Sequence, residues 1–237
     1  MLKDRQTRFW RVALGTEVLC SCLKILGGKP EVVVQAGLGS GDETKILHRD
    51  FPDAEFVAIE GLARYVSEWK DDYPGKIIHG AIQTEHGGEI NFVDARQRSK
   101  LRPKQLQSTD GGKTFSGGWE GKRSAPAVSF DGLLADGLIP KGRTLLHIDV
   151  EGSELLAFKG GTEFLKQVDF IWTELRTELD PREPWFPADQ DIMEELLKHG
   201  FYNIFRAGMW QKREPTGDGL FVRRGWRRRI ERTARKA

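Results

Sequence analysis

The feature that most constrains the fold of this chain is a short apolar run that leads directly into a glycine-rich turn. Residues 32–34 are three consecutive valines, which favour a buried strand, and residues 37–41 read Gly-Leu-Gly-Ser-Gly. Glycine lets a backbone turn sharply and approach a ligand closely. We expect a helix to start at about residue 42, so the segment predicts a strand, a tight turn and a helix N-terminus.

Strands and helices alternate along the rest of the chain. Further strands are expected over residues 56–59, 76–82, 144–150 and 168–175, with a closing antiparallel pair over 201–206 and 219–222. Helices are expected over residues 4–26, 42–49, 62–69, 130–135, 153–165 and 189–199. A strand at 90–93 is expected to pair with 76–82 through a turn at 86–88. This alternation predicts an α/β, Rossmann-like fold with a mostly parallel sheet covered on both faces.

Two basic segments lie on an otherwise acidic chain. Residues 222–237 carry a net charge of +7 and residues 94–125 carry +5, although the whole chain has a net charge of only +2. Residues 94–125 are also rich in glycine and interrupt the alternation, so we interpret them as an inserted basic loop. The predicted organisation is an N-terminal helix over 1–30, a main domain over 31–222 and a basic C-terminal tail over 223–237.

Composition places the chain among globular proteins and predicts a cytoplasmic one. No apolar run is long enough to cross a bilayer, and the N-terminus lacks the pattern of a secretory signal. Cys20 and Cys22 lie two residues apart on an expected helix, where they would face different sides. We therefore expect two buried thiols, with a redox pair as the alternative.

The carboxyl ends of the strands are the expected ligand site. Glu60 ends the second strand, where an acid accepts hydrogen bonds from ribose hydroxyls, and Asp42 stands where a dinucleotide fingerprint has its last glycine. An acid beside a pyrophosphate is unfavourable, which favours S-adenosylmethionine over a nicotinamide dinucleotide. A turn without a ligand is the alternative. The residues expected to bind the cofactor are Gln35, Ala36, Gly37, Leu38, Gly39, Gly41, Glu60, Gly61, Ala81, Ile82 and Asp149.

A second candidate site follows the strand at 144–150. Asp149 and Glu151 flank its end, and two carboxylates are costly to bury without partners such as a sulfonium, a hydroxyl or a metal. Capping of the helix that follows is the alternative.

The run from Thr144 to Gly161, Thr-Leu-Leu-His-Ile-Asp-Val-Glu-Gly-Ser-Glu-Leu-Leu-Ala-Phe-Lys-Gly-Gly, resembles the signature of the FkbM-type methyltransferases. The segments 128–134, 170–174 and 197–202 resemble neighbouring motifs of that family in the right order. The resemblance covers about residues 31–206. It implies a class I methyltransferase with a seven-stranded sheet that uses S-adenosylmethionine. Two positions depart from the family pattern: Gln35 stands where Asp is usual, and His147 where Lys is common.

The resemblance also implies methylation of an oxygen on a small molecule or sugar. Asp149 is then the best candidate to orient the acceptor or to act as base, followed by Glu151 and Glu174. We predict no bound metal, although an Asp149–Glu151–Glu174 metal site is conceivable. The basic loop is interpreted as a lid that attracts an anionic acceptor, with a solvated insertion as the alternative.

Two rival functions stay open at this point. One is a nicotinamide-dependent oxidoreductase. The other is a non-catalytic nucleotide-binding protein that engages nucleic acid through its basic tail. We do not expect nucleic acid to be the partner.

Overall fold

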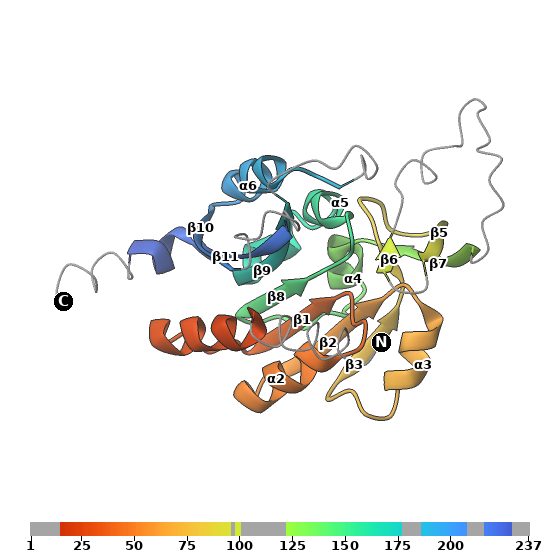
Figure 1. Ribbon diagram of the computed structural model, residues 1–237, viewed down its shortest axis with the longest axis horizontal. Coiled ribbons are helices and arrows are strands. Elements are labelled where there is room, and N and C mark those ends of the chain that lie inside the picture. The colour runs from red at the N-terminus through yellow and green to blue at the C-terminus, as the bar shows by residue number, and fades with distance from the viewer. Residues whose placement is uncertain (1–14, 96–97, 101–121, 177–185, 208–215, 229–237) are drawn as a thin grey trace.

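The computed structural model describes residues 15–95, 98–100, 122–176, 186–207 and 216–228 (Figure 1). Most of the expected basic loop, residues 101–121, lies outside the described residues, as do the first part of the expected N-terminal helix and the last part of the basic tail. The described part of the N-terminal helix covers 15–26. No helix in the described part of the chain is long and apolar enough to cross a membrane.

The main sheet has seven strands in the order β10-β11-β9-β8-β1-β2-β3. Its strands are β1 (Val32–Ala36), β2 (Glu55–Glu60), β3 (Lys76–His79), β8 (Thr144–Ile148), β9 (Val168–Arg176), β10 (Phe201–Ala207) and β11 (Thr216–Arg223). Five neighbouring strands of this sheet are parallel to one another: β3, β2, β1, β8 and β9. Strand β11 runs antiparallel to both β9 and β10. The predicted α/β fold with a closing antiparallel strand is confirmed.

Two apolar layers cover the two faces of this sheet (Figure 1). On one face lie the helix 15–26, α2 (Asp42–Asp50) and α3 (Ala63–Trp69). On the other lie α4 (Phe130–Ala135), α5 (Glu154–Lys159), the 3-10 turn η2 (Phe164–Gln167) and α6 (Asp189–Lys198). All five side chains of β1 and of β8 are buried, as expected for central parallel strands.

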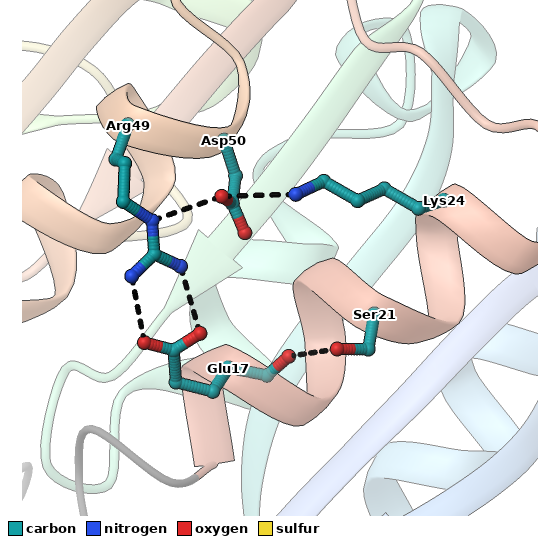
Figure 2. Close-up of polar contacts among 5 residues, drawn as sticks. All are labelled: Glu17, Ser21, Lys24, Arg49 and Asp50. Atoms are coloured by element: carbon teal, nitrogen blue, oxygen red, sulfur yellow. Dashed lines mark hydrogen bonds and ion pairs between the residues drawn. The ribbon is translucent and has the colours of Figure 1, made fainter.

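An ionic cluster fastens the helix 15–26 to α2 (Figure 2). The guanidinium of Arg49 donates two hydrogen bonds to the carboxylate of Glu17, at 2.9 and 2.7 Å, and one to Asp50 at 3.0 Å. Lys24 pairs with the same Asp50 at 2.9 Å. Hydrogen bonds from Arg49 lower the pKa of Asp50 to about 2, so both carboxylates stay charged at neutral pH. These contacts join the described part of the N-terminal helix to α2 of the main domain.

The segment between β3 and α4 departs from the expected fold. The expected strand 76–82 is divided at Gly80 into β3 and β4 (Ala81–Ile82). A Cβ at Gly80 would lie 2.8 Å from the side chain of Val128, so the close approach of β7 requires glycine at this position. β4 belongs to a second sheet with β5 (Glu89–Ala95), β6 (Arg98–Lys100) and β7 (Lys122–Val128), in the order β4-β7-β5-β6.

The expected pairing of 90–93 with 76–82 is therefore wrong. β5 pairs antiparallel with β6 and β7 instead. The basic segment 94–125 is also not a loop throughout, because both of its described ends form strands of this small sheet. Sequence periodicity could not reveal this pairing, since β7 is separated from β5 by more than twenty residues.

Candidate cofactor and acceptor site

The glycine turn packs against the end of β8. Gly37 donates its N–H to the carbonyl of Ile59 at 2.9 Å, and Asp149 donates its N–H to the carbonyl of Ala36 at 2.9 Å. Gly37 has a φ of +87°, and a Cβ built on it would lie 1.9 Å from the carbonyl oxygen of Asp149. The two sequence motifs thus meet, backbone against backbone, where β1 separates β2 from β8. The strand order reverses at this position, which is where α/β sheets bind ligands.

Glu60 holds the glycine turn from the end of β2. One oxygen of its carboxylate accepts the N–H groups of Leu38 at 2.9 Å and Gly39 at 3.1 Å, and the other accepts the N–H of Leu62 at 2.7 Å. The side chain is buried, with 6% of its surface exposed. A carboxylate has about four lone-pair positions, so it can still accept a further hydrogen bond. Gly61, the next expected cofactor residue, accepts a hydrogen bond from His79 at 3.2 Å.

Gln35 lies beneath the turn. Its Oε1 accepts hydrogen bonds from the hydroxyls of Thr44 at 3.0 Å and Tyr73 at 3.2 Å, which ties β1 to α2 and to the turn between α3 and β3. Its buried Nε2 has no hydrogen-bond partner among the described residues. The side chains of Ala36 and Leu38 are buried in the two apolar layers, so these two residues face the strand ends with their backbone.

The expected residues Ala81 and Ile82 form β4 at the boundary between the two sheets. Both side chains are 2% exposed. Gln83 follows them, donates its N–H to the carbonyl of Val128 at 2.7 Å, and keeps a buried Nε2 without a partner in the described part of the chain. Sequence reasoning missed Gln83, since a single glutamine after a short strand carries no recognisable pattern.

Glu154 holds the turn after β8. The sequence identified this acid only as part of the motif shared with the family, without a predicted role. Glu154 accepts hydrogen bonds from the N–H groups of Val150 at 3.0 Å and Gly152 at 3.0 and 3.2 Å. Between them Glu151 adopts a φ of +53°, a left-handed conformation that costs a non-glycine residue on the order of 1 kcal/mol. Asp149 is exposed at the head of this turn, whereas Glu154 is buried beneath it.

Two further carboxyl groups lie beside this turn, on β9 and β11. Glu174 and Asp218 are direct partners in the antiparallel register, and both point to the face that the helix 15–26 covers. Burial raises the pKa of Glu174 well above its usual range, and the charges of Asp149, Glu154 and Glu151 raise it further. Burial, assisted by Asp149, raises the pKa of Asp218 to about 7. Glu174 therefore favours its protonated form at neutral pH, and Asp218 carries a proton in about half of the molecules there.

Asp218 was missed by sequence reasoning because its place depends on the register of β11. Asp149 and Glu151, which the sequence singled out together with Glu174, lie close enough to Glu174 for their charges to raise its pKa. In the described part of the chain, no group of three or more acids, histidines or cysteines is arranged to hold a metal ion.

We predict that Glu154 makes stability fall as pH rises. Burial, assisted by the charge of Asp149, raises the pKa of Glu154 from 4.5 to about 7. The folded protein keeps this proton while the unfolded chain releases it, so the stabilisation is complete below about pH 4.5 and is lost as the pH approaches 7. The loss amounts to at most about 3 kcal/mol.

Urea unfolding at pH 5 and pH 8 tests this expectation with Glu154→Gln, which keeps the acceptor oxygen but does not titrate. The variant should lose less stability than the native protein over this interval. Glu163→Gln, at an exposed glutamate paired with Lys166, should behave like the native protein. Equal pH dependence in the native protein and in Glu154→Gln would contradict the assignment.

Comparison with known proteins identifies the family. The model of the FkbM methyltransferase domain matches residues 31–202, which is most of the chain. The chain belongs to the FkbM methyltransferase family. This family is one of methyltransferases, which decides against the nicotinamide-dependent oxidoreductase.

Individual relatives of this FkbM methyltransferase are distant. Hexuronic acid methyltransferase AglP of Haloferax volcanii is 36% identical over 64 residues, which cover 27% of this chain and 26% of that protein. The match thus spans about a quarter of the relative's length. A solved S-adenosylmethionine-dependent methyltransferase from Clostridium acetobutylicum superposes with a TM-score of 0.50 at 6% identity, covering 88% of this chain and 90% of that one. Magnesium protoporphyrin IX methyltransferase of Synechocystis gives 0.47 at 11% identity and 93% coverage of both.

We predict that Glu60→Ala weakens the binding of S-adenosylhomocysteine more than Glu174→Ala does. Removing Glu60 leaves three backbone N–H groups without their acceptor, two of them in the glycine turn, and removes one acceptor for the ribose. A hydrogen bond to a charged group contributes about 1.5–3 kcal/mol. The dissociation constant measured by calorimetry should rise by roughly 10- to 100-fold. The opposite order of the two variants would place the cofactor elsewhere.

Proposed function

We propose that this FkbM methyltransferase methylates a hydroxyl group of a saccharide or another small molecule. The observation that carries the proposal is the position of Asp149. This exposed carboxylate is fixed by its own backbone to the glycine turn, while Glu174 and Asp218 lie on the neighbouring strands. A base at the head of a rigid turn, next to the cofactor's anchoring loop, suits the removal of a proton from an alcohol.

The residues at the strand ends fit S-adenosylmethionine. Glu60 has a spare acceptor position for the ribose hydroxyls, the turn 37–41 presents backbone to the ligand, and the buried Nε2 of Gln83 lacks a partner that an adenine nitrogen would supply. Gln35 supports the turn from below. When bound, this cofactor supplies a methyl group already activated on a sulfonium.

The protein's own contribution is then alignment and proton transfer. Fixing two reactants in a productive geometry contributes on the order of 7–11 kcal/mol. The Asp149 carboxylate takes the proton of the acceptor hydroxyl, because an alcohol is a poor nucleophile while protonated. Glu174, which favours the protonated form, and Asp218, which is partly protonated at neutral pH, can donate hydrogen bonds to other oxygens of a sugar.

A saccharide acceptor is supported by the short match to a hexuronic acid methyltransferase. A hexuronic acid is anionic, and the net charge of +5 on residues 94–125 suits an anionic acceptor. We place the enzyme in the cytoplasm, which agrees with two free thiols at Cys20 and Cys22.

The experiment is a transfer assay with a methyl-labelled donor and a panel of acceptors. The panel contains glucuronic and galacturonic acids as free sugars and glycosides, the matching neutral hexoses, a phenol and a primary amine. We expect a methyl ether on a sugar hydroxyl, with hexuronic acids preferred to neutral hexoses. Transfer to the amine or to the carboxylate instead of a hydroxyl would overturn the proposal.

A further inference from the structure

The first part of the basic C-terminal segment is anchored to the body of the protein. Arg223, the last residue of β11, donates side-chain hydrogen bonds to the carbonyls of Val168, at 2.5 Å, and Leu165. A short helix over 224–228 follows, and the ring of Trp226 packs against Phe170 with 4.9 Å between ring centroids. The arginines of this helix are therefore held at the edge of the sheet where β9 begins.

The end of the helix 15–26 lies at the same edge (Figure 1). Gly28, just beyond that helix, packs so closely on Phe170 that a Cβ there would lie 2.6 Å from the ring. Phe170 thus contacts both Gly28 and Trp226. Ile25, in the last turn of the helix, has 84% of its surface exposed, more than any other large apolar side chain in the described part of the chain.

Three exposed arginines lie on the short helix 224–228, whose Trp226 shares the contact with Phe170 that Gly28 makes. Arg224, Arg227 and Arg228 are exposed, and the guanidinium of Arg227 lies over the ring of Tyr202 at 4.6 Å. Nearby, a shallow hollow of about 310 Å³ is lined by two charge-balanced pairs, Lys24 with Asp50 and Lys29 with Asp53. The excess charge therefore comes from the arginines of the short helix.

We propose that this edge, the docking edge, binds the surface of an anionic lipid bilayer. An exposed aliphatic side chain beside a group of cations matches a peripheral membrane site, where the apolar group enters the interface and the cations meet lipid headgroups. Nucleic acid is a poorer match. Its phosphates would use the arginines but not Ile25, and the Trp226 ring that could stack on a base is packed on Phe170.

The docking edge is formed where the parallel strands begin, whereas the glycine turn, Glu60 and Asp149 lie where they end. Bound in this way, the protein keeps its cofactor site directed away from the bilayer. Membrane binding and methyl transfer are therefore separable, and a variant that loses one should keep the other.

Vesicle co-sedimentation of the full chain tests the proposal. We compare phosphatidylcholine vesicles with vesicles in which about one third of the lipid is phosphatidylglycerol. The native protein should bind the anionic vesicles, and binding should weaken as salt increases. Arg224→Ser combined with Arg228→Ser should reduce the partition coefficient by up to roughly 30-fold, since each cation near such a surface contributes about 1 kcal/mol, or roughly a fivefold effect.

Matched controls separate this site from general charge and hydrophobicity. Lys70→Ser combined with Lys76→Ser removes the same charge from another exposed surface and should leave binding within about twofold of the native value. Ile25→Ser should reduce binding several-fold, whereas Leu197→Ser, at a residue 53% exposed on α6, should not. All variants should bind S-adenosylhomocysteine as the native protein does.

Three results would overturn the proposal. The first is no preference of the native protein for anionic vesicles. The second is an equal loss of binding in the lysine and arginine double variants. The third is salt-sensitive binding of duplex DNA or RNA that releases the protein from the vesicles. If Ile25→Ser left that binding unchanged, the arginines would be assigned to nucleic acid.

Discussion

Gly37→Ala is expected to abolish cofactor binding and to destabilise the fold by at least about 4 kcal/mol. The added Cβ would lie 1.9 Å from the carbonyl oxygen of Asp149, which is a backbone atom and cannot rotate away. The φ of +87° at this position adds a second penalty for any residue with a side chain. To relieve the contact, β1 and β8 must separate at the point where the two halves of the site meet.

Gly39→Ala is the matched control for this experiment. Gly39 also has a positive φ, +51°, but nothing lies within 4 Å of a Cβ built there. We expect a loss of about 1 kcal/mol in urea unfolding and only a modest change in affinity for S-adenosylhomocysteine. Equal losses in the two variants would show that conformational strain, and not the contact with Asp149, explains the need for glycine at position 37.

Asp149→Asn is expected to reduce kcat by about 10²- to 10⁴-fold. Asparagine keeps the size and the backbone contacts of the residue but cannot accept the proton of the acceptor hydroxyl. The measurement is steady-state methyl transfer to the acceptor that the panel identifies. Affinity for S-adenosylhomocysteine, measured by calorimetry, should change by less than about threefold, because the proposed role concerns the acceptor.

Asp72→Asn, at an exposed aspartate after α3, should leave both quantities unchanged. Glu174→Gln and Glu151→Gln should reduce kcat less than Asp149→Asn does, in keeping with their lower rank as candidate bases. If Asp149→Asn weakened S-adenosylhomocysteine binding strongly while kcat stayed high, Asp149 would be a cofactor ligand and the base would have to be sought elsewhere.

Much of the fold could be predicted from the sequence because its central strands are local and regular. The three valines before the glycine turn and the apolar run before Asp149 each mark a buried parallel strand, and both are fully buried in the structure. The small second sheet could not be predicted. Its strands are short, and at the break Gly80 packs closely on Val128, nearly fifty residues away in the chain.

The candidate site shows the same division between local and distant information. Glu60 and Asp149 stand at the ends of predictable strands. Because these strands are parallel neighbours of β1, the two residues can be predicted to lie at the same edge of the sheet. Asp218 becomes part of the site only through its pairing with Glu174, and antiparallel register is not encoded in a single strand. Likewise, the sequence indicated an acid two residues after Gly152 but not that Glu154 turns back to hold that turn.

The chain leaves the main sheet at Gly80, builds the small sheet, and returns to the main layers with α4. The residues between Gln83 and α4 could therefore be exchanged without cutting a strand of the main sheet. Hybrid enzymes that carry residues 84–128 of other family members would keep the proposed cofactor residues up to Gln83 while varying the segment that forms most of the small sheet. Such a separation allows the acceptor to change, by evolution or by engineering, while the strands that carry Glu60 and Asp149 stay the same.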